Sequence, residues 1–181
     1  MGANIFRRAA RIGVITAESG AEKQALLKQF ADRRRGEGLR VVGVVELAAP
    51  DAHSDCGALD LLDLATGTRI AISQNLGPGS TACNLDPGGV AMACAAAQRA
   101  IEAGADLVVL SKFGKLEAAN GGLRDAFAAA MAAETPALTT LKPTMRDEWA
   151  NFAGPLFDEL PPELDALENW WRGLARKRSA A

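Results

Sequence analysis

The sequence has little of what disulfide, metal and membrane proteins need. Its 181 residues include one histidine and three cysteines, an odd number, with no CxxC or HxxH spacing. These absences argue against a disulfide framework and against a zinc site around His53, Asp55, Cys56 and Cys83, and they favour a reducing compartment. No apolar run approaches the roughly 18 residues of a membrane span. We therefore expect a cytoplasmic protein without a metal site or a membrane segment.

An excess of charge of one sign is also absent. The net charge is −2 at pH 7, so no global basic field attracts nucleic acid or anionic lipid. The basic runs Arg33–Arg35 and Arg176–Arg178 are local, and we interpret them as solvated helix faces and ends. With 49% hydrophobic and 23% charged residues, the chain can bury one full core. We expect a single domain over residues 1–181 that binds neither nucleic acid nor membrane.

What the chain does have is a regular succession of apolar runs and helical segments. The order strand–helix–strand is the unit that makes parallel sheets, so we predict an α/β domain with helices on both faces of a mainly parallel sheet. A β-hairpin insertion is expected around Gly67, and C-terminal helices at about residues 145–178 should pack on the domain. The expected strands are 12–15, 41–47, 59–64, 69–73, 106–110 and 137–141, and the expected helices are 22–36, 88–104, 122–134, 146–152 and 163–177.

The segment from Arg11 to Lys28 has the layout of a phosphate-binding loop, with an apolar strand, a short polar loop and a helix. Against the pattern GxxxxGK[ST], Lys23 is the one chemical match, because Ala17 and Glu22 replace the glycines and Gln24 replaces the Ser/Thr. Lys23 at a helix N-terminus suits an anion, although a solvated first-turn lysine is the alternative. The candidate ligand-binding residues here are Thr16, Ala17, Glu18, Ser19, Gly20, Ala21, Lys23 and Gln24.

Two further loops follow predicted strands at the same edge of the sheet, where ligands of open α/β sheets bind. In loop 111–120, Lys112 and Lys115 could supply charge and Glu117 could orient a ligand, or the loop could cap a helix. In loop 74–87, amide and hydroxyl groups could wrap a ligand, whereas Asp86 before Pro87 is typical of a helix N-cap. The candidate residues in these two loops are Gln74, Asn75, Ser111, Lys112, Gly114, Lys115 and Glu117.

Several blocks resemble known families. The segments LRVVGVVE, LDLLDLATGTRIAIS and DLVVLSKFGKLE resemble the THEP1-type nucleoside-triphosphatases, a P-loop branch. A closer resemblance, over roughly residues 10 to 172, is to the uncharacterised bacterial family DUF2478. Its blocks are present as ISQNLG at 72–77, CNLD at 83–86, SKFGKLE at 111–117, GGL at 121–123 and NWW at 169–171. The resemblance implies a P-loop NTPase-like three-layer sandwich and a link to molybdate handling.

The resemblance also shows which parts are replaced. Where the active branch carries a Walker B Asp-Glu pair that holds Mg²⁺, this sequence has Ser111 and Lys112. With Gln24 in the loop, both protein supports for magnesium are absent, whereas Lys23 and Glu117 remain at matching positions. A lysine-rich site without a carboxylate pair suits an anion better than a metal. We therefore expect a nucleotide or an oxyanion as ligand, rather than a metal cofactor.

Three functional hypotheses follow. The first is a degenerate P-loop-like protein that binds a small anionic ligand in an accessory or regulatory role, without efficient hydrolysis. The second is an atypical Mg²⁺-dependent nucleoside-triphosphatase that uses Glu18, Glu46 or Glu117 for the metal. The third is a non-catalytic partner protein with a vestigial site. We also expect a homodimer, since one of Trp170 and Trp171 must face away from the buried stripe of its helix.

Overall fold

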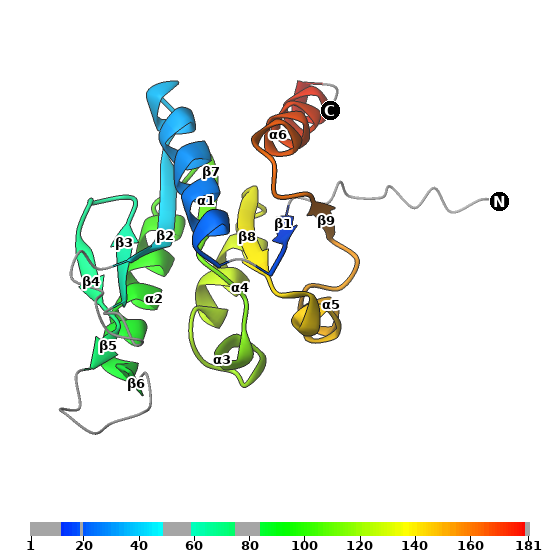
Figure 1. Cartoon of the computed structure of the whole chain (residues 1–181). Coiled ribbons are helices and arrows are strands. Elements are labelled where there is room, and N and C mark those ends of the chain that lie inside the picture. The colour runs from blue at the N-terminus through cyan, green and yellow to red at the C-terminus, as the bar shows by residue number, and fades with distance from the viewer. Residues whose placement is uncertain (1–11, 19, 49–58, 75–83, 180–181) are drawn as a thin grey trace.

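A computed structural model describes residues 12–18, 20–48, 59–74 and 84–179. Within these residues, a seven-stranded sheet has the order β4-β3-β2-β7-β8-β1-β9 (Figure 1). Five of its strands are parallel, and β3 and β4 are antiparallel additions beside β2. The fold is thus the predicted mainly parallel α/β arrangement. Its strands are β1 (Ile12–Thr16), β2 (Val41–Ala48), β3 (Leu59–Asp63), β4 (Arg69–Ala71), β7 (Leu107–Leu110), β8 (Ala137–Leu141) and β9 (Phe157–Leu160).

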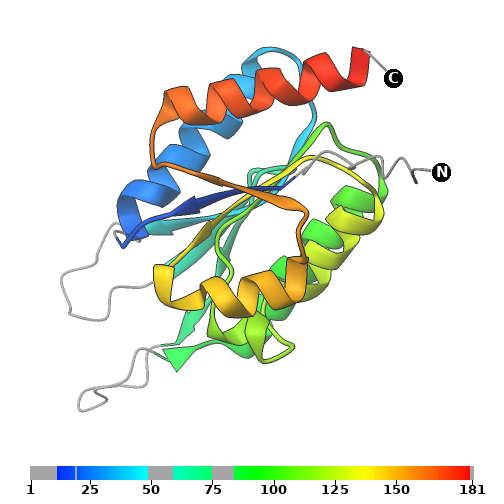
Figure 2. The same ribbon diagram turned by 90° about the vertical axis from the view of Figure 1, so that its right-hand side faces the viewer.

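Helices cover both faces of this sheet and complete a three-layer sandwich. Figure 2 shows α1 and α6 on one face and α2, α4 and α5 on the other. A hydrophobic core fills each space between helices and sheet. The helices are α1 (Gly20–Gly36), α2 (Pro87–Glu102), α3 (Lys115–Ala118), α4 (Arg124–Ala132), the 3₁₀ helix η1 (Pro143–Met145), α5 (Arg146–Ala153) and α6 (Leu164–Ser179).

Successive side chains of the central strands point alternately into the two hydrophobic cores. In β2, Val41 and Val45 join the core under α1 and α6, whereas Val42 and Val44 join the core under α2 and α4. Successive side chains of a strand point to opposite faces, so an uninterrupted apolar run is required where both faces are covered. Burying each of these valines contributes about 1.5–3 kcal/mol relative to leaving it in water. The continuous apolar runs therefore mark the centre of the sheet.

Five aromatic rings gather under α4 and α5. Phe113 lies at the centre, with its ring centroid 5.9 Å from Phe127, 5.1 Å from Trp149 and 5.4 Å from Phe152. Phe157 of β9 contacts Trp149 from the other side at 5.8 Å. Most of these pairs are edge-to-face, the geometry that aromatic quadrupoles favour. Trp149 is fully buried and belongs to the core.

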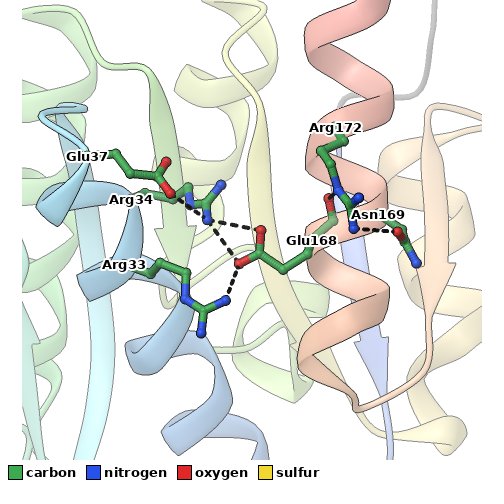
Figure 3. A network of polar contacts seen from close by, with 6 residues as sticks. All are labelled: Arg33, Arg34, Glu37, Glu168, Asn169 and Arg172. Atoms are coloured by element: carbon green, nitrogen blue, oxygen red, sulfur yellow. Dashed lines mark hydrogen bonds and ion pairs between the residues drawn. The ribbon is translucent and has the colours of Figure 1, made fainter.

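The last helix is fastened to the first by a buried ion pair. The Arg34 guanidinium donates to both carboxylate oxygens of Glu168 at 2.9 Å, and Arg33 reaches the same carboxylate at 3.0 Å (Figure 3). The Arg34 guanidinium also lies over the rings of Phe30 and Trp171. Arg33–Arg35 was interpreted as a solvated helix face. That interpretation is wrong for Arg34, which is 5% exposed.

A glycine in β1 allows α6 to pack closely against the sheet. Gly13 in β1 allows Leu138, Leu160 and Trp170 to meet over the strand, because a Cβ there would overlap the two leucine side chains. Trp170 is consequently buried against the sheet, and Trp171 is half-buried and packs edge-on against Phe30. Helix α6 therefore packs on the domain through both of its tryptophans, and α5 packs through Trp149.

The predicted β-hairpin insertion is confirmed, and side-chain hydrogen bonds stabilise its turn. β3 pairs with β4 in antiparallel register. Asp63 accepts hydrogen bonds from the Ala65 backbone N–H at 2.8 Å and from the Thr66 hydroxyl at 2.9 Å. Gly67 has a φ of 76°, a conformation that glycine adopts without strain. An Asp-initiated turn completed by a left-handed glycine thus specifies the hairpin.

Some predicted elements differ from the structure. Helix α1 begins at Gly20 rather than Glu22, and the loop predicted at 111–120 contains the short helix α3. The loop predicted at 74–87 includes parts of a small two-stranded sheet, β5 (Ser73–Gln74) and β6 (Asn84–Leu85). Strand β9 was not predicted at all. Its sequence FDEL is short, acidic and half exposed, because β9 is an edge strand that pairs with β1 alone. Among the helices formed by the described residues, none is long and apolar enough to cross a membrane.

Candidate functional site

The candidate site lies where β1, β8, β7 and β2 end. These four strands are parallel neighbours, so the segments that follow them meet at one edge of the sheet. The segment after β1 leads into α1, and Ala17 donates its backbone N–H to the carbonyl of Leu141 at the end of β8. Thr16 ends β1 and Glu18 is exposed. Ser19 lies outside the described residues.

Lys23 is buried at the start of α1. Its side chain is 4% exposed, and its ammonium donates to the carbonyl oxygens of Ala17 and, at 3.3 Å, Leu141. An ammonium has three donors, so two carbonyls leave one hydrogen for a ligand. Because Lys23 is buried, the solvated-lysine interpretation is wrong. The lysine instead joins the segment after β1 to the end of β8.

The charge of Lys23 is held in an unfavourable environment. Its pKa is lowered below the ordinary lysine value of 10.5, first by burial, then by the Lys142 ammonium and to a smaller extent by Lys112. The carboxylates of Glu18 and Glu46 act in the opposite direction. Lys142 directly follows β8 and was not among the predicted site residues. The signal available in the sequence was its position in the loop after the last predicted strand.

Gln24 has a structural role that the comparison with the phosphate-binding loop pattern did not predict. Its amide nitrogen donates to the carbonyl of Ser111 at 2.6 Å and lies 3.5 Å from the Thr140 hydroxyl, and its amide oxygen accepts the backbone N–H of Glu46 at 3.0 Å. The Thr140 hydroxyl also donates to Ser111, at 2.8 Å. A hydroxyl is too short to make these contacts from α1. Gln24 therefore joins the ends of β2, β7 and β8.

The residues at the Walker B positions do not present carboxylates. Ser111 is buried at 2% exposure, and its carbonyl is engaged by Gln24 and Thr140. Lys112 is half exposed and makes an ion pair of 2.5 Å with Glu46, whose side chain is 14% exposed. No group of three or more His, Cys, Asp or Glu side chains that could hold a metal occurs in the part of the chain that the structure describes.

Glu117 stabilises its own loop. One carboxylate oxygen accepts the Gly114 N–H and the other accepts the Leu123 N–H, both at 2.9 Å. The first of these is the reciprocal half of a capping box at the start of α3. In this arrangement both oxygens are occupied, and the helix-capping alternative describes Glu117 well. Lys115, on the first turn of α3, is exposed.

The remaining candidates divide between described and undescribed residues. Gln74 ends β5, whereas Asn75 lies outside the described residues, as do His53, Asp55, Cys56 and Cys83. Asp86 caps α2 by accepting the Gly88 N–H at 2.9 Å, with Pro87 in the first turn, as predicted. Cys94 is buried in α2, where burial raises the pKa of its thiol. It is a packing residue.

A cavity of about 220 Å³ opens beside this edge. Glu46, Ser111 and Lys112 line it where β2 and β7 end, and Lys115 and Leu116 line it from α3. The cavity therefore shares residues with the lysine-rich edge. The sequence predicted the charged residues that line this cavity. Its apolar walls were not predicted, because they come from elements that are distant in the sequence.

The chain has a P-loop NTPase-like α/β fold. The structure is similar to the crystal structure of THEP1 from the hyperthermophile Aquifex aeolicus, with a TM-score of 0.58 over 83% of this chain and 90% of that one, at 17% identity. The family model DUF2478, described as a protein of unknown function, matches residues 12–170. The chain belongs to this family.

A curated relative is also similar. The chain is 37% identical over 162 residues to the molybdenum import ATP-binding protein ModC 2 of Bradyrhizobium diazoefficiens. The match covers 90% of this chain and 18% of that protein, so the chain spans about a fifth of the relative's length.

Proposed function

We propose that this protein binds a small anion, a nucleotide or an oxyanion, at the ends of β1, β8 and β7, and that it has an accessory or regulatory role in molybdenum handling. The observation that carries the proposal is that the buried Lys23 shares one edge of the sheet with Lys112 and Lys142, whose ammonium groups disfavour its charge and lower its pKa. Each of these lysines follows a different one of three neighbouring strands. Lys23 is buried, whereas Lys112 and Lys142 are exposed. A bound anion would relieve the repulsion between the three ammonium groups.

The helix adds to the anion preference. α1 has 17 residues and begins directly after the segment that carries Glu18. The first turn of a helix has free N–H groups and the positive end of the helix dipole, which stabilise a bound anion. Glu22 in this turn and Glu18 beside it are negative, so the lysines are needed to make the site attractive overall. The similarity to part of a molybdenum import ATP-binding protein supports molybdate and nucleotides as the first ligands to test.

Efficient hydrolysis is not part of the proposal. The amide of Gln24 is engaged by three strand ends, and the Walker B positions carry Ser111 and Lys112. Mg²⁺ in such enzymes is held by a hydroxyl in the loop and an acidic residue on the neighbouring strand. Neither group is present at these positions. We propose a cytoplasmic protein that binds neither nucleic acid nor membrane; a homodimer remains a prediction.

The test is a thermal-shift and calorimetric screen against ATP, ADP, GTP, phosphate, sulfate, molybdate and tungstate, each with and without Mg²⁺. A ligand at 100 times its Kd stabilises the folded state by about 2.7 kcal/mol, which a domain of this size reports clearly. We expect at least one anion to bind, and Lys23→Met combined with Lys112→Met to abolish binding. Lys28→Met is the matched control, because Lys28 lies on the same helix but pairs with Asp32.

Other outcomes identify the alternatives. Mg²⁺-dependent release of phosphate from ATP or GTP that is lost in Lys23→Met would establish an atypical nucleoside-triphosphatase. A screen in which no anion stabilises the protein would refute the binding site and favour a partner protein with a vestigial site. Binding that survives in the double lysine variant would place the site elsewhere.

A further inference from the structure

The 220 Å³ cavity beside the lysine edge has mostly apolar walls. They come from the β3–β4 hairpin and the residue after it, from β6 and the start of α2, and from the α3 region: Leu61, Ile72, Leu85, Val90, Leu116 and Leu123. A bare phosphate or molybdate gains nothing from such walls, since it is strongly hydrated. The walls therefore suit a ligand that carries an apolar group.

Two of these wall residues are exposed to water. Leu85 is 38% exposed and Leu116 is 46% exposed, whereas large apolar side chains in the described part of the chain are mostly buried. Each square ångström of apolar surface taken from water contributes about 25 cal/mol. A group that enters the cavity and covers both leucines would gain that free energy.

Two lysines, Lys112 and Lys115, and two glutamates also line the cavity. Glu46 is paired with Lys112, and the carboxylate of Glu117 is occupied by the N–H groups of Gly114 and Leu123. Among the described residues, Lys115 has no ion-pair partner. Of the four charged residues that line the cavity, Lys115 is therefore the one whose side chain has no ion pair or hydrogen bond within the described part of the chain.

The cavity and the lysine cluster are parts of one region. Glu46 and Lys112 line the cavity, and the same two residues act on the charge of Lys23. A volume of about 220 Å³ is below the roughly 300–1,000 Å³ of a cavity for a drug-sized ligand. It is suited to one ring system rather than to a complete nucleotide.

We infer that the ligand is an organic anion with a ring, rather than a bare oxyanion. The ring occupies the cavity between Leu85, Leu116 and Leu123, and the anionic group faces Lys112 and Lys115. This inference rests on the anion site proposed above and specifies its ligand class. Lys115, Leu85 and Leu116 thereby become specificity residues of that site.

The test compares three probes by calorimetry: inorganic phosphate, glycerol 2-phosphate and phenyl phosphate. Phenyl phosphate carries a ring of suitable size, and glycerol 2-phosphate carries a polar group instead. We expect phenyl phosphate to bind at least tenfold more tightly than either of the others. Leu116→Gln should lower the ratio of the phenyl phosphate affinity to the inorganic phosphate affinity to about one. Leu156→Gln is the matched control, because Leu156 is 41% exposed and does not line the cavity.

The outcomes separate the two proposals. If inorganic phosphate binds and phenyl phosphate binds no more tightly, the ring site is refuted and the anion site stands. If none of the three probes binds, the ring site is refuted, and the anion site is then decided by the wider screen of nucleotides and oxyanions described above. An advantage of phenyl phosphate that persists in both Leu116→Gln and Leu85→Gln would place the ring outside this cavity.

Discussion

The side chain of Gln24 and the backbone of Ser111 are 87 residues apart in the sequence, and a hydrogen bond of 2.6 Å joins them. The same amide group reaches the N–H of Glu46 on the other side. In a phosphate-binding loop, this position carries a hydroxyl that binds Mg²⁺. Here Gln24 occupies the position and links the ends of β2 and β7 by hydrogen bonds. This relationship explains why a residue of the wrong chemistry for magnesium is nevertheless buried and fully engaged.

Restoring the hydroxyl at this position should destabilise the protein. Gln24→Thr leaves the Ser111 carbonyl with one donor fewer and the Glu46 N–H without its acceptor. We expect a loss of about 1–3 kcal/mol in the free energy of unfolding, the cost of leaving buried polar groups unsatisfied. Urea denaturation measures it. Gln29→Thr on the exposed face of the same helix is the control for helix propensity and should change stability by less than about 0.5 kcal/mol. Equal losses in the two variants would show that the contacts of Gln24 contribute nothing.

Anion affinity should depend on the protonation of Lys23. Its pKa in the free protein lies below 10.5 because burial and the ammonium groups of Lys142 and Lys112 disfavour its charge. A bound anion favours the ammonium form, so binding takes up a proton once the pH exceeds the pKa of the free lysine. Affinity should therefore fall as the pH rises through that lowered pKa.

Sulfate is the suitable probe for this pH dependence, since its charge is constant over the alkaline range. Calorimetry from pH 7 to 10 should show the fall beginning at a lower pH than an unperturbed lysine would produce. Lys23→Met should lack this phase, while Lys28→Met should retain it. Sulfate affinity that stays constant to pH 10 would contradict a direct role for the Lys23 ammonium.

The pair between Arg34 and Glu168 should matter more than an exposed ion pair of the same chemistry. Glu168→Gln keeps the shape of the side chain but leaves the buried guanidinium short of a counter-charge, although Glu37 still contacts it at 2.9 Å. We expect a loss of up to about 3 kcal/mol, near the low end of the cost of breaking a buried pair. Glu159→Gln, which breaks the more exposed pair with Arg146, should cost less than about 1 kcal/mol. Chemical denaturation of the two variants makes the comparison, and similar losses would refute the role of burial.

Gly43 in β2 should tolerate no side chain. Its φ is 109°, and a Cβ at this position would overlap the backbone carbonyl of Val109 in β7. Because that neighbour is backbone and cannot move aside, we expect Gly43→Ala to prevent folding or to lower the unfolding temperature by well over 10 °C. Gly173→Ala is the control: nothing lies within 4 Å of its Cβ position in α6, and it should stabilise the protein by about 0.5–1 kcal/mol. A Gly43→Ala protein as stable as the parent would show that the strand can shift.

The fold could be predicted from the sequence where the physical signal is local. The apolar runs at 41–47 and 106–110 are buried on both faces, and such strands need no tertiary information to be recognised. The hairpin could be predicted from Gly67 because the turn depends on one left-handed residue. β9 could not be predicted, since its strand character derives from pairing with β1 and its sequence carries two acidic residues.

The site could be predicted only in part. The positions of Lys23 and Lys112 follow from the ends of predicted strands, and both lie at the edge where they were expected. The burial of Lys23 and the bracing by Gln24 depend on contacts with residues about 90 to 120 positions away, which a linear pattern does not contain. Glu117 accepts the N–H of Gly114, the N-cap of α3, but Gly114 has no side chain to complete a capping box, so the spacing alone did not indicate this role, nor the contact with Leu123.

The lysines of the candidate site lie in segments that follow three separate strands. Lys23 follows β1, Lys112 follows β7 and Lys142 follows β8, so they belong to the beginning, the middle and the end of the chain. An anion held by all three would act as a reversible cross-link between these segments, in addition to the contacts that Lys23 and Gln24 already make. Binding would then restrict the motion of segments that are far apart in the sequence, because the ends of these strands could separate only after the ligand had left. A protein built in this way can signal the presence of its ligand through rigidity alone, with no change in the fold.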